Sequence, residues 1–325
     1  MFTLRQYLLA LLDSRGLTRT LGEIDVCRDE QGRPCFSAGN SAAVFRIRLG
    51  GRISSLRCYL RPMRHLKEIY GQRLLEKELY LHTSPETGVW VDTVLGDWIE
   101  GSTLHETVAQ AAALRDRESL QILVRLFDRL ALALVTDDRA HGDLKPENII
   151  VGDDGTLCPI DFDASYLPAF AGEISPELGT AAYQHPARTA ADFDERIDDY
   201  PAALISTALH ALAEDPTLWD RYGSSDGLLY TPQRIASDPA YRETLALFEK
   251  RGMAVQYRIA QLLTAPTLRL FGLAELLAEA VREKPAARSG TEAETPELFV
   301  ENGRWGYRTA ERVCLLYTSP SPRDS

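Results

Sequence analysis

An acid, a lysine and an asparagine lie within six positions of one another in the segment HGDLKPENIIV, residues 141–151. Asp143 could accept a proton and, with Asn148 beside it, hold a metal ion, while Lys145 could neutralise negative charge. A second acid, Asp161, ends the segment NIIVGDDGTLCPIDFD, whose two apolar runs around a turn are typical of a hairpin. If those strands pair, both acids lie at one end of the hairpin. Such residues suit phosphoryl transfer, whose loose transition state depends on charge neutralisation and alignment.

The composition limits what else the chain can do. It has 325 residues, of which 45% are hydrophobic, and a net charge of -11. This charge argues against a broad basic surface for nucleic acid or an anionic membrane. The five cysteines show no C-x-x-C pair and no metal-ligand spacing with histidine, so a zinc site or a disulfide framework is not expected. We therefore expect a cytoplasmic protein with a small-molecule or protein partner, and the sequence leaves its oligomeric state open.

The elements that would position these residues differ between the two halves of the chain. Residues 1–20 predict an amphipathic helix that is too short to span a membrane. Residues 35–61 alternate between apolar and polar positions around a Gly50–Gly51 turn, which predicts a hairpin. The spacing in HLKEIYGQRLLEKELYLH, residues 65–82, predicts a helix, and GVWVDTVLGDWIEG returns to strand alternation. From about residue 103 the pattern becomes helical, with a long apolar stripe over 119–136.

The ordered motifs resemble those of eukaryotic-like serine/threonine protein kinases, over roughly residues 20–285. The resemblance implies an α+β bilobal fold, with a small β-rich lobe at about 21–100 and a larger helical lobe at about 101–285. It also implies that Asp143 is the catalytic base, that Lys145 contacts the transferred phosphate, and that Asn148 and Asp161 hold Mg²⁺ for ATP. In GTAAYQHP, the segment with Gly179 and Thr180 resembles the part of a kinase that seats the substrate. Asp198 resembles the buried acid that braces the catalytic loop.

The ATP-binding motifs of the first lobe depart from the family pattern. The Gly-rich loop is reduced to Ser37, Gly39 and Ala42 in SAGNSAAVF, with Val44 following, so one glycine of three remains. Arg57 aligns with the strand lysine that contacts the α- and β-phosphates, and arginine and lysine are not interchangeable.

The predicted ion-pair partner of Arg57 is Glu76, on the expected helix. Glu68 and Glu78 are the alternatives, since the register is uncertain by a helical turn.

Two further departures fall in the second lobe. Gly142 replaces the arginine through which loop phosphorylation activates many kinases, so such activation is not expected here. Asp163 replaces the glycine of the metal-binding triplet, which restricts the backbone at that position.

Three functions fit these motifs. The first is an active kinase that transfers the γ-phosphate of ATP to a protein hydroxyl. The second is a nucleotide-binding pseudokinase that acts as an interaction module. The third is a small-molecule kinase, because HGD also occurs in phosphotransferases that modify small molecules. The KPEN and GTAAYQHP segments are longer and more specific, and they favour the protein kinase.

The carboxyl-terminal region has a different character. Residues 286–296 are polar and predict a linker. Residues 297–313 contain an Asn302–Gly303 turn between apolar runs and resemble the start of a tryptophan-glycine repeat. Such repeats normally occur in arrays, so we expect the chain to be cut short. Residues 314–325 resemble translated sequencing-adapter sequence, and we expect this tail to be non-native.

Overall fold

The computed structural model describes the chain except for residues 153–154, 283–296, 302–303, 309–312 and 316–325. The predicted linker at 286–296, the Asn302–Gly303 turn and most of the predicted tail lie outside the described residues. The chain divides into two compact units, Met1–Ile99 and Glu100–Leu316. Within the described part of the chain, no helix is long and apolar enough to cross a lipid bilayer.

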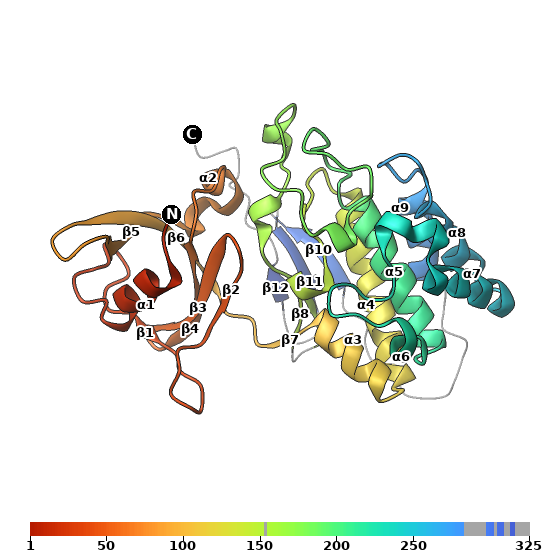
Figure 1. The fold of residues 1–325 in the computed structure, drawn as a ribbon, viewed down its shortest axis with the longest axis horizontal. Helices are drawn as coiled ribbons and strands as arrows, with labels where there is room; N and C mark the ends of the chain where they lie inside the picture. The colour runs from red at the N-terminus through yellow and green to blue at the C-terminus, as the bar shows by residue number, and fades with distance from the viewer. Residues whose placement is uncertain (153–154, 283–296, 302–303, 309–312, 316–325) are drawn as a thin grey trace. The chain divides into compact units, whose positions relative to one another are not determined.

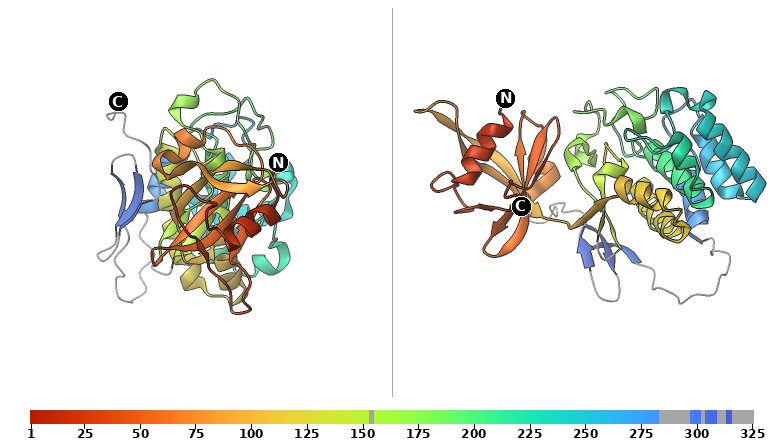
Figure 2. Two further views of the ribbon diagram at one scale, coloured as in Figure 1. Left: turned by 90° about the vertical axis from the view of Figure 1, so that its left-hand side faces the viewer. Right: turned by 60° about the horizontal axis from the view of Figure 1, so that its bottom comes forward.

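The first unit is a curled antiparallel sheet with one helix packed on it (Figures 1 and 2). Its six strands pair in the order β1-β3-β4-β6-β5, and β2 pairs with β3 as well. The elements are α1 (Leu4–Leu12), β1 (Asp25–Val26), β2 (Phe36–Ala38), β3 (Ala42–Leu49), β4 (Arg52–Tyr59), α2 (Leu66–Tyr70), β5 (Leu74–His82) and β6 (Gly88–Asp97). The predicted helix near the amino terminus and the predicted hairpin over 35–61 are both confirmed.

Local sequence signals set these elements. A capping box between Thr3 and Gln6 begins α1, because each side chain accepts a backbone N–H of the other residue. Gly50 and Gly51 both adopt positive φ, 53° and 86°, which the tight turn between β3 and β4 requires.

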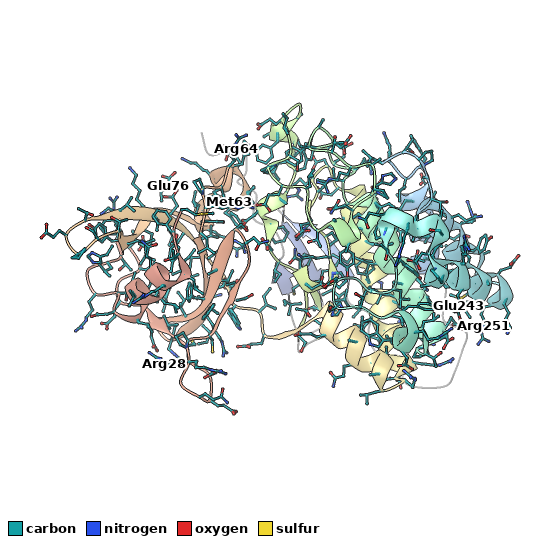
Figure 3. All side chains as sticks on the ribbon, in the orientation of Figure 1. Arg28, Met63, Arg64, Glu76, Glu243 and Arg251 are labelled. Atoms are coloured by element: carbon teal, nitrogen blue, oxygen red, sulfur yellow. The ribbon has the colours of Figure 1, made fainter. Side chains whose placement is uncertain are left out.

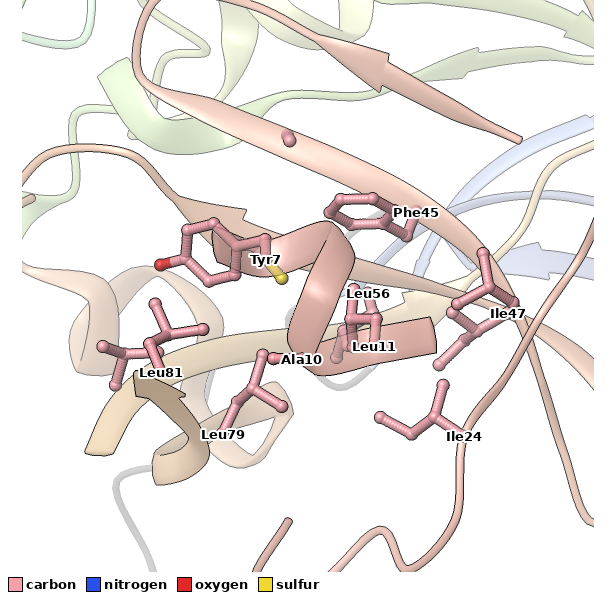
Figure 4. Packing of buried hydrophobic residues seen from close by; sticks show 13 residues of the cluster. Tyr7, Ala10, Leu11, Ile24, Phe45, Ile47, Leu56, Leu79 and Leu81 are labelled. Atoms are coloured by element: carbon pink, nitrogen blue, oxygen red, sulfur yellow. The ribbon is translucent and has the colours of Figure 1, made fainter. Parts of the chain in front are cut away.

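The hydrophobic core of the first unit lies between α1 and one face of the sheet (Figure 4). Tyr7 and Leu11 of α1 are fully buried against Phe45 and Leu56 of the central strands. The Tyr7 hydroxyl donates a hydrogen bond of 2.6 Å to the carbonyl oxygen of Tyr59. The helix is therefore an integral layer of this unit, since its removal would expose the apolar face of the sheet.

The second unit is mainly helical. Its central pair is α4 (Arg117–Thr136) and α5 (Asp199–Glu214), which lie side by side in both figures. Around them are α3 (Leu104–Ala113), α6 (Leu218–Tyr222), α7 (Pro239–Arg251), α8 (Ala254–Leu262) and α9 (Leu273–Arg282). A small sheet joins β7 (Gly101–Thr103), β8 (Ile149–Gly152) and β9 (Leu157–Pro159) in that order. The long helix predicted over 119–136 and the hairpin predicted after Asn148 are confirmed.

A second antiparallel sheet forms near the carboxyl end, from β10 (Glu297–Glu301), β11 (Arg304–Arg308) and β12 (Val313–Leu315). The pairing of Glu301 with Arg304 fits the predicted hairpin. Cys314 and Leu315, which fall at the start of the expected non-native tail, pair with β11. That this hairpin begins a tryptophan-glycine repeat stays a prediction.

One predicted element is wrong. Residues 65–82 form the short helix α2, a 3₁₀ turn at Gly71–Arg73 and then the strand β5. Leu79 and Leu81 are both buried and pair with Val91 and Val89 of β6, which is the two-residue period of a strand. A register shift between Leu75 and Leu79 breaks that alternation, so the leucines of the whole segment fall at near-helical spacing.

Candidate active site

The loop that precedes β8 is held by a buried acid. Asp198, which is 1% exposed, accepts the backbone N–H of Gly142 at 3.0 Å and that of His141. Burial raises the pKa of Asp198, and these two donors together with the charge of Arg188 oppose the rise. Asp198 directly precedes α5 in the chain, so the loop is fixed to the central helix pair. This is the bracing position that the sequence predicted for it.

His141 orients the loop from its other side. Its Nε2 lies 2.8 Å from the carbonyl oxygen of Ile160, and its Nδ1 accepts the N–H of Asp143 at 3.3 Å. A carbonyl can only accept, so these two contacts select the neutral tautomer protonated at Nε2. The ring also packs on Phe162, with 5.0 Å between the ring centroids. His141 thus ties the Asp143 loop to the strand end that carries Asp161.

Asp143 is surrounded by three donors. The Thr180 N–H donates to its Oδ1 at 2.6 Å, Lys145 Nζ lies 3.3 Å from its Oδ2, and Asn148 Nδ2 lies 3.2 Å from the same oxygen. The Asn148 amide also donates to the main-chain carbonyl of Asp143 at 2.9 Å. With its side chain only 17% exposed, Asp143 is an oriented carboxylate beside a fixed cation.

Thr180 brings the predicted substrate segment to this carboxylate. Lys145 Nζ donates to the Thr180 hydroxyl at 2.8 Å, so the lysine joins both residues. The preceding residue, Gly179, has a φ of 73°. A Cβ there would lie 2.7 Å from the Gly142 carbonyl oxygen and 3.0 Å from Asp143 Oδ1, so only glycine permits this close approach.

The predicted metal ligands lie next to each other on the β8–β9 hairpin. The Ile160 N–H donates to the Asn148 carbonyl oxygen at 2.8 Å, which places Asn148 and Asp161 at the same end of the hairpin. The Asn148 side-chain nitrogen makes both hydrogen bonds to Asp143, so the side-chain oxygen takes no part in them. No group of three or more His, Cys, Asp or Glu residues forms a metal-binding cluster among the described residues. One carboxylate and one amide oxygen still fit Mg²⁺, which completes its shell with water and substrate phosphate.

The first unit aligns part of its predicted nucleotide-binding set. Ser37 of β2 pairs with Val44 of β3, and Val44 pairs with Arg57 of β4, so the three residues form one cross-strand row. Arg57 is half-buried, with its guanidinium 5.8 Å from the Tyr59 ring centroid. Gly39 donates its N–H to the carbonyl oxygen of Ala42 at 2.9 Å, which closes the β2–β3 turn.

The expected Glu76 position is wrong. Glu76, labelled in Figure 3, lies in β5 instead of on a helix. Its side chain is 64% exposed, and its carboxylate lies 3.8 Å from Lys67 Nζ. The alternative Glu78 is buried and accepts the N–H groups of Thr20 and Leu21 at 2.8 and 2.9 Å, so it stabilises the fold of the first unit. Glu68 remains on the one-turn helix α2, where it is exposed.

Sequence reasoning missed Arg188. Its Nη1 donates to the Gly142 carbonyl oxygen at 3.2 Å and also to the Gln184 side chain. Arg188 lies two residues beyond the GTAAYQHP segment and belongs to no motif, so only the spatial approach of the chain identifies it.

Two curated protein kinases are similar to the chain in sequence. The chain is 30% identical over 167 residues to CBL-interacting protein kinase 17 of Oryza sativa subsp. japonica, covering 50% of this chain and 35% of that protein. It is 28% identical over 213 residues to serine/threonine-protein kinase PknL of Mycobacterium tuberculosis, covering 62% of this chain and 52% of the relative. The chain is similar to serine/threonine protein kinases.

The similarity agrees with the fold. A curled antiparallel sheet followed by a helical unit is a mixed α+β arrangement consistent with a bilobal kinase-like fold, as the sequence predicted. The aligned stretches span about half or less of the length of these relatives. No protein-family model matches the chain.

Proposed function

We propose that the protein transfers the γ-phosphate of ATP to a hydroxyl group of a protein. The arrangement of Lys145, Asn148 and Thr180 around the Asp143 carboxylate is the observation that carries this proposal. The similarity to two serine/threonine protein kinases supports the same class of reaction. The identity of the acceptor protein is left open by both.

Asp143 is assigned the role of general base. Its carboxylate accepts the proton of the acceptor hydroxyl, and the Thr180 N–H keeps that carboxylate in one orientation. Lys145, which contacts both Asp143 and Thr180, neutralises charge on the transferred phosphoryl group.

Asn148 and Asp161 are assigned as the residues that hold Mg²⁺. When bound, the ion neutralises the charge of the triphosphate. Hydrogen bonds from the Asn148 amide to Asp143 keep the asparagine oriented for this role. In the first unit, Arg57 is assigned to the nucleotide phosphates, with Ser37, Gly39, Ala42 and Val44 beside it.

The decisive experiment compares the wild type with Asp143→Asn. Each purified protein is incubated with labelled ATP, Mg²⁺ and a mixed protein acceptor. Loss of a general base typically lowers the rate by ~10²- to 10⁴-fold, so Asp143→Asn should suppress transfer and leave nucleotide affinity nearly unchanged. Equal transfer by both proteins would remove Asp143 from this role.

A nucleotide-binding pseudokinase is the second candidate. The departure of Glu76 from the expected helix favours it, because the partner predicted for Arg57 lies in β5 beside Lys67. A thermal melt with ATP and Mg²⁺ distinguishes both the kinase and the pseudokinase from a kinase-like fold that binds no nucleotide. Ligand at a hundredfold excess over its Kd adds about 2.7 kcal/mol of stability, which raises Tm by several degrees. A shift without transfer identifies the pseudokinase, whereas no shift excludes both candidates.

A further inference from the structure

The loop that carries Asp143 has no room for a side chain at position 142. Gly142 has a φ of 80°, and a Cβ built on it would overlap the carbonyl oxygen of Ala164 and lie 2.8 Å from the carbonyl carbon. Any larger residue would therefore displace the backbone of the loop or of residue 164. The arginine that the kinase resemblance leads one to expect at this position is sterically excluded.

A cation reaches the same loop from a different part of the chain. Arg188 donates to the Gly142 carbonyl oxygen at 3.2 Å, and its guanidinium is close enough to Asp198 and Asp143 for their charges to act on it. Burial lowers the pKa of Arg188, and those two carboxylates oppose the change. Its Nε and Nη2 are buried and have no hydrogen-bond partner among the described residues. Electrostatic attraction to the two acids offsets part of the cost of burying the charge.

The stretch of chain between the Asp161 hairpin and Arg188 offers no exposed hydroxyl for a regulatory phosphate. This stretch, residues 165–186, includes the predicted substrate segment GTAAYQHP at residues 179–186. Its hydroxyl-bearing residues other than Thr180 are buried, namely Ser165, Tyr166, Ser175 and Tyr183. The Thr180 hydroxyl accepts a hydrogen bond from Lys145. Contacts made by the unmodified chain thus hold the segment against Asp143.

We infer that Arg188 is a positioning residue that locks the Asp143 loop to the substrate segment with its permanent charge. It does so without phosphorylation. This inference rests on the proposed phosphotransfer activity, because it concerns how the catalytic carboxylate is kept in place. Arg188 lies just beyond the substrate segment, and through Gln184 and Gly142 it contacts both the segment and the loop. It acts through Asp143 and makes no contact with the reacting atoms.

The test measures the maximal transfer rate and the KM for ATP in Arg188→Met, Arg188→Lys and Arg188→Ala. Loss of a charge-assisted hydrogen bond corresponds to roughly 10- to 100-fold in rate. We expect the maximal rate to fall by this factor in Arg188→Met, with the KM for ATP changed less than about threefold. Arg188→Lys should retain part of the rate, and millimolar ethylguanidine should restore part of the rate of Arg188→Ala. Phosphatase treatment of the wild type should leave its rate unchanged.

A matched control is Arg115→Met. Arg115 donates to the carbonyl oxygen of Ala112 at 2.6 Å and pairs with Asp220, so its guanidinium also anchors backbone, but at the end of α3. The Arg115→Met protein should be less stable than the wild type and should keep the wild-type transfer rate. If Arg188→Met behaves like this control, or if phosphatase abolishes the wild-type rate, the inference is overturned.

Hydrogen exchange separates this inference from the proposed function. Absence of transfer in the wild type would reject the function but leave the amide protons measurable. The Thr180 and Gly142 amides, which donate to Asp143 and Asp198, should then exchange faster in Arg188→Met than in Arg115→Met. Unchanged exchange at both amides would overturn the positioning role independently of activity.

Discussion

Substitution of Gly142 by alanine tests the packing of the Asp143 loop. The new methyl group would meet the Ala164 carbonyl, and the backbone would be held at a φ of 80°. Left-handed backbone costs a non-glycine residue roughly 1–2 kcal/mol, and forcing an additional group into a packed site costs about 1–3 kcal/mol. The sum predicts a loss of ~2–5 kcal/mol in the free energy of unfolding.

Gly172→Ala is the matched control for the backbone cost. Gly172 has a φ of 85°, and a Cβ there would have no atom within 4 Å. The control should therefore lose only the ~1–2 kcal/mol that the positive φ imposes. The difference between the two variants isolates the steric contribution of the Ala164 carbonyl.

Urea unfolding followed by circular dichroism measures both free energies, with thermal melts as a second observable. At roughly 2–4 °C per kcal/mol, Gly142→Ala should lower Tm by about 4–20 °C and Gly172→Ala by about 2–8 °C. A Gly142→Ala protein no less stable than Gly172→Ala would refute the close approach of residues 142 and 164. The same result would remove the steric argument that position 142 cannot hold an arginine and that Arg188 supplies the positive charge at this loop instead.

Three further predictions concern other buried or charged groups. Burial raises the pKa of Asp199 to about 7 from its ordinary 3.8, so the folded state retains a proton that the unfolded state has lost between those values. Stability should then fall by up to roughly 4 kcal/mol as the pH rises from about 4 to 7, and urea unfolding across this range should show a flatter dependence in Asp199→Asn. Asp128 of α4 accepts hydrogen bonds from Ser206 at 2.7 Å and from His210 at 2.8 Å on α5, so Asp128→Ala should cost about 2–4 kcal/mol. A double-mutant cycle with His210→Ala that gives no coupling energy would contradict that link. Arg57→Ala should weaken ATP binding by roughly 10- to 100-fold in calorimetric titration, whereas Arg57→Lys should retain or improve it. Unchanged affinity in both Arg57 variants would show that the phosphate cation lies elsewhere.

The sequence predicted the elements around Asp143 well because their signals are local. The apolar stripe of α4 and the turn residues between β8 and β9 each specify a structure within a short window. Asp143 precedes the β8–β9 hairpin in the chain and Asp161 follows it, so pairing of the two strands brings the acids to the same end. Asp198 holds the loop through a contact between residues far apart in sequence, which local signals do not reveal. Its role was predicted from the order of the motifs along the chain.

Two features could not be predicted, for different physical reasons. In residues 65–82 the irregularity between Leu75 and Leu79 shifts the strand alternation, so the leucine spacing imitates a helix. The pairing with β6 decides the outcome, and it depends on residues more distant in sequence. Arg188 approaches Gly142 across a separation of 46 residues, and nothing in its immediate neighbours marks a charge destined for that loop.

The two units differ in how completely they assemble the predicted site. In the second unit, Asp143 is fixed by Lys145, Asn148 and Thr180, and the loop beneath it is fixed by the buried Asp198. Burying a carboxylate is unfavourable unless it is hydrogen-bonded, so this loop geometry depends on the donors to Asp198 and on a glycine at position 142, which adopts the positive φ without strain. In the first unit, the lysine expected at position 57 is an arginine, and the glutamate expected to pair with it lies in β5. Under the proposed function, substitutions confined to β2, β3 and β4 should weaken ATP binding and leave the transfer step, which is assigned to residues of the second unit, unchanged. The Asp143 and Arg57 variants therefore separate two failures: loss of turnover at unchanged affinity, and loss of affinity at unchanged maximal rate.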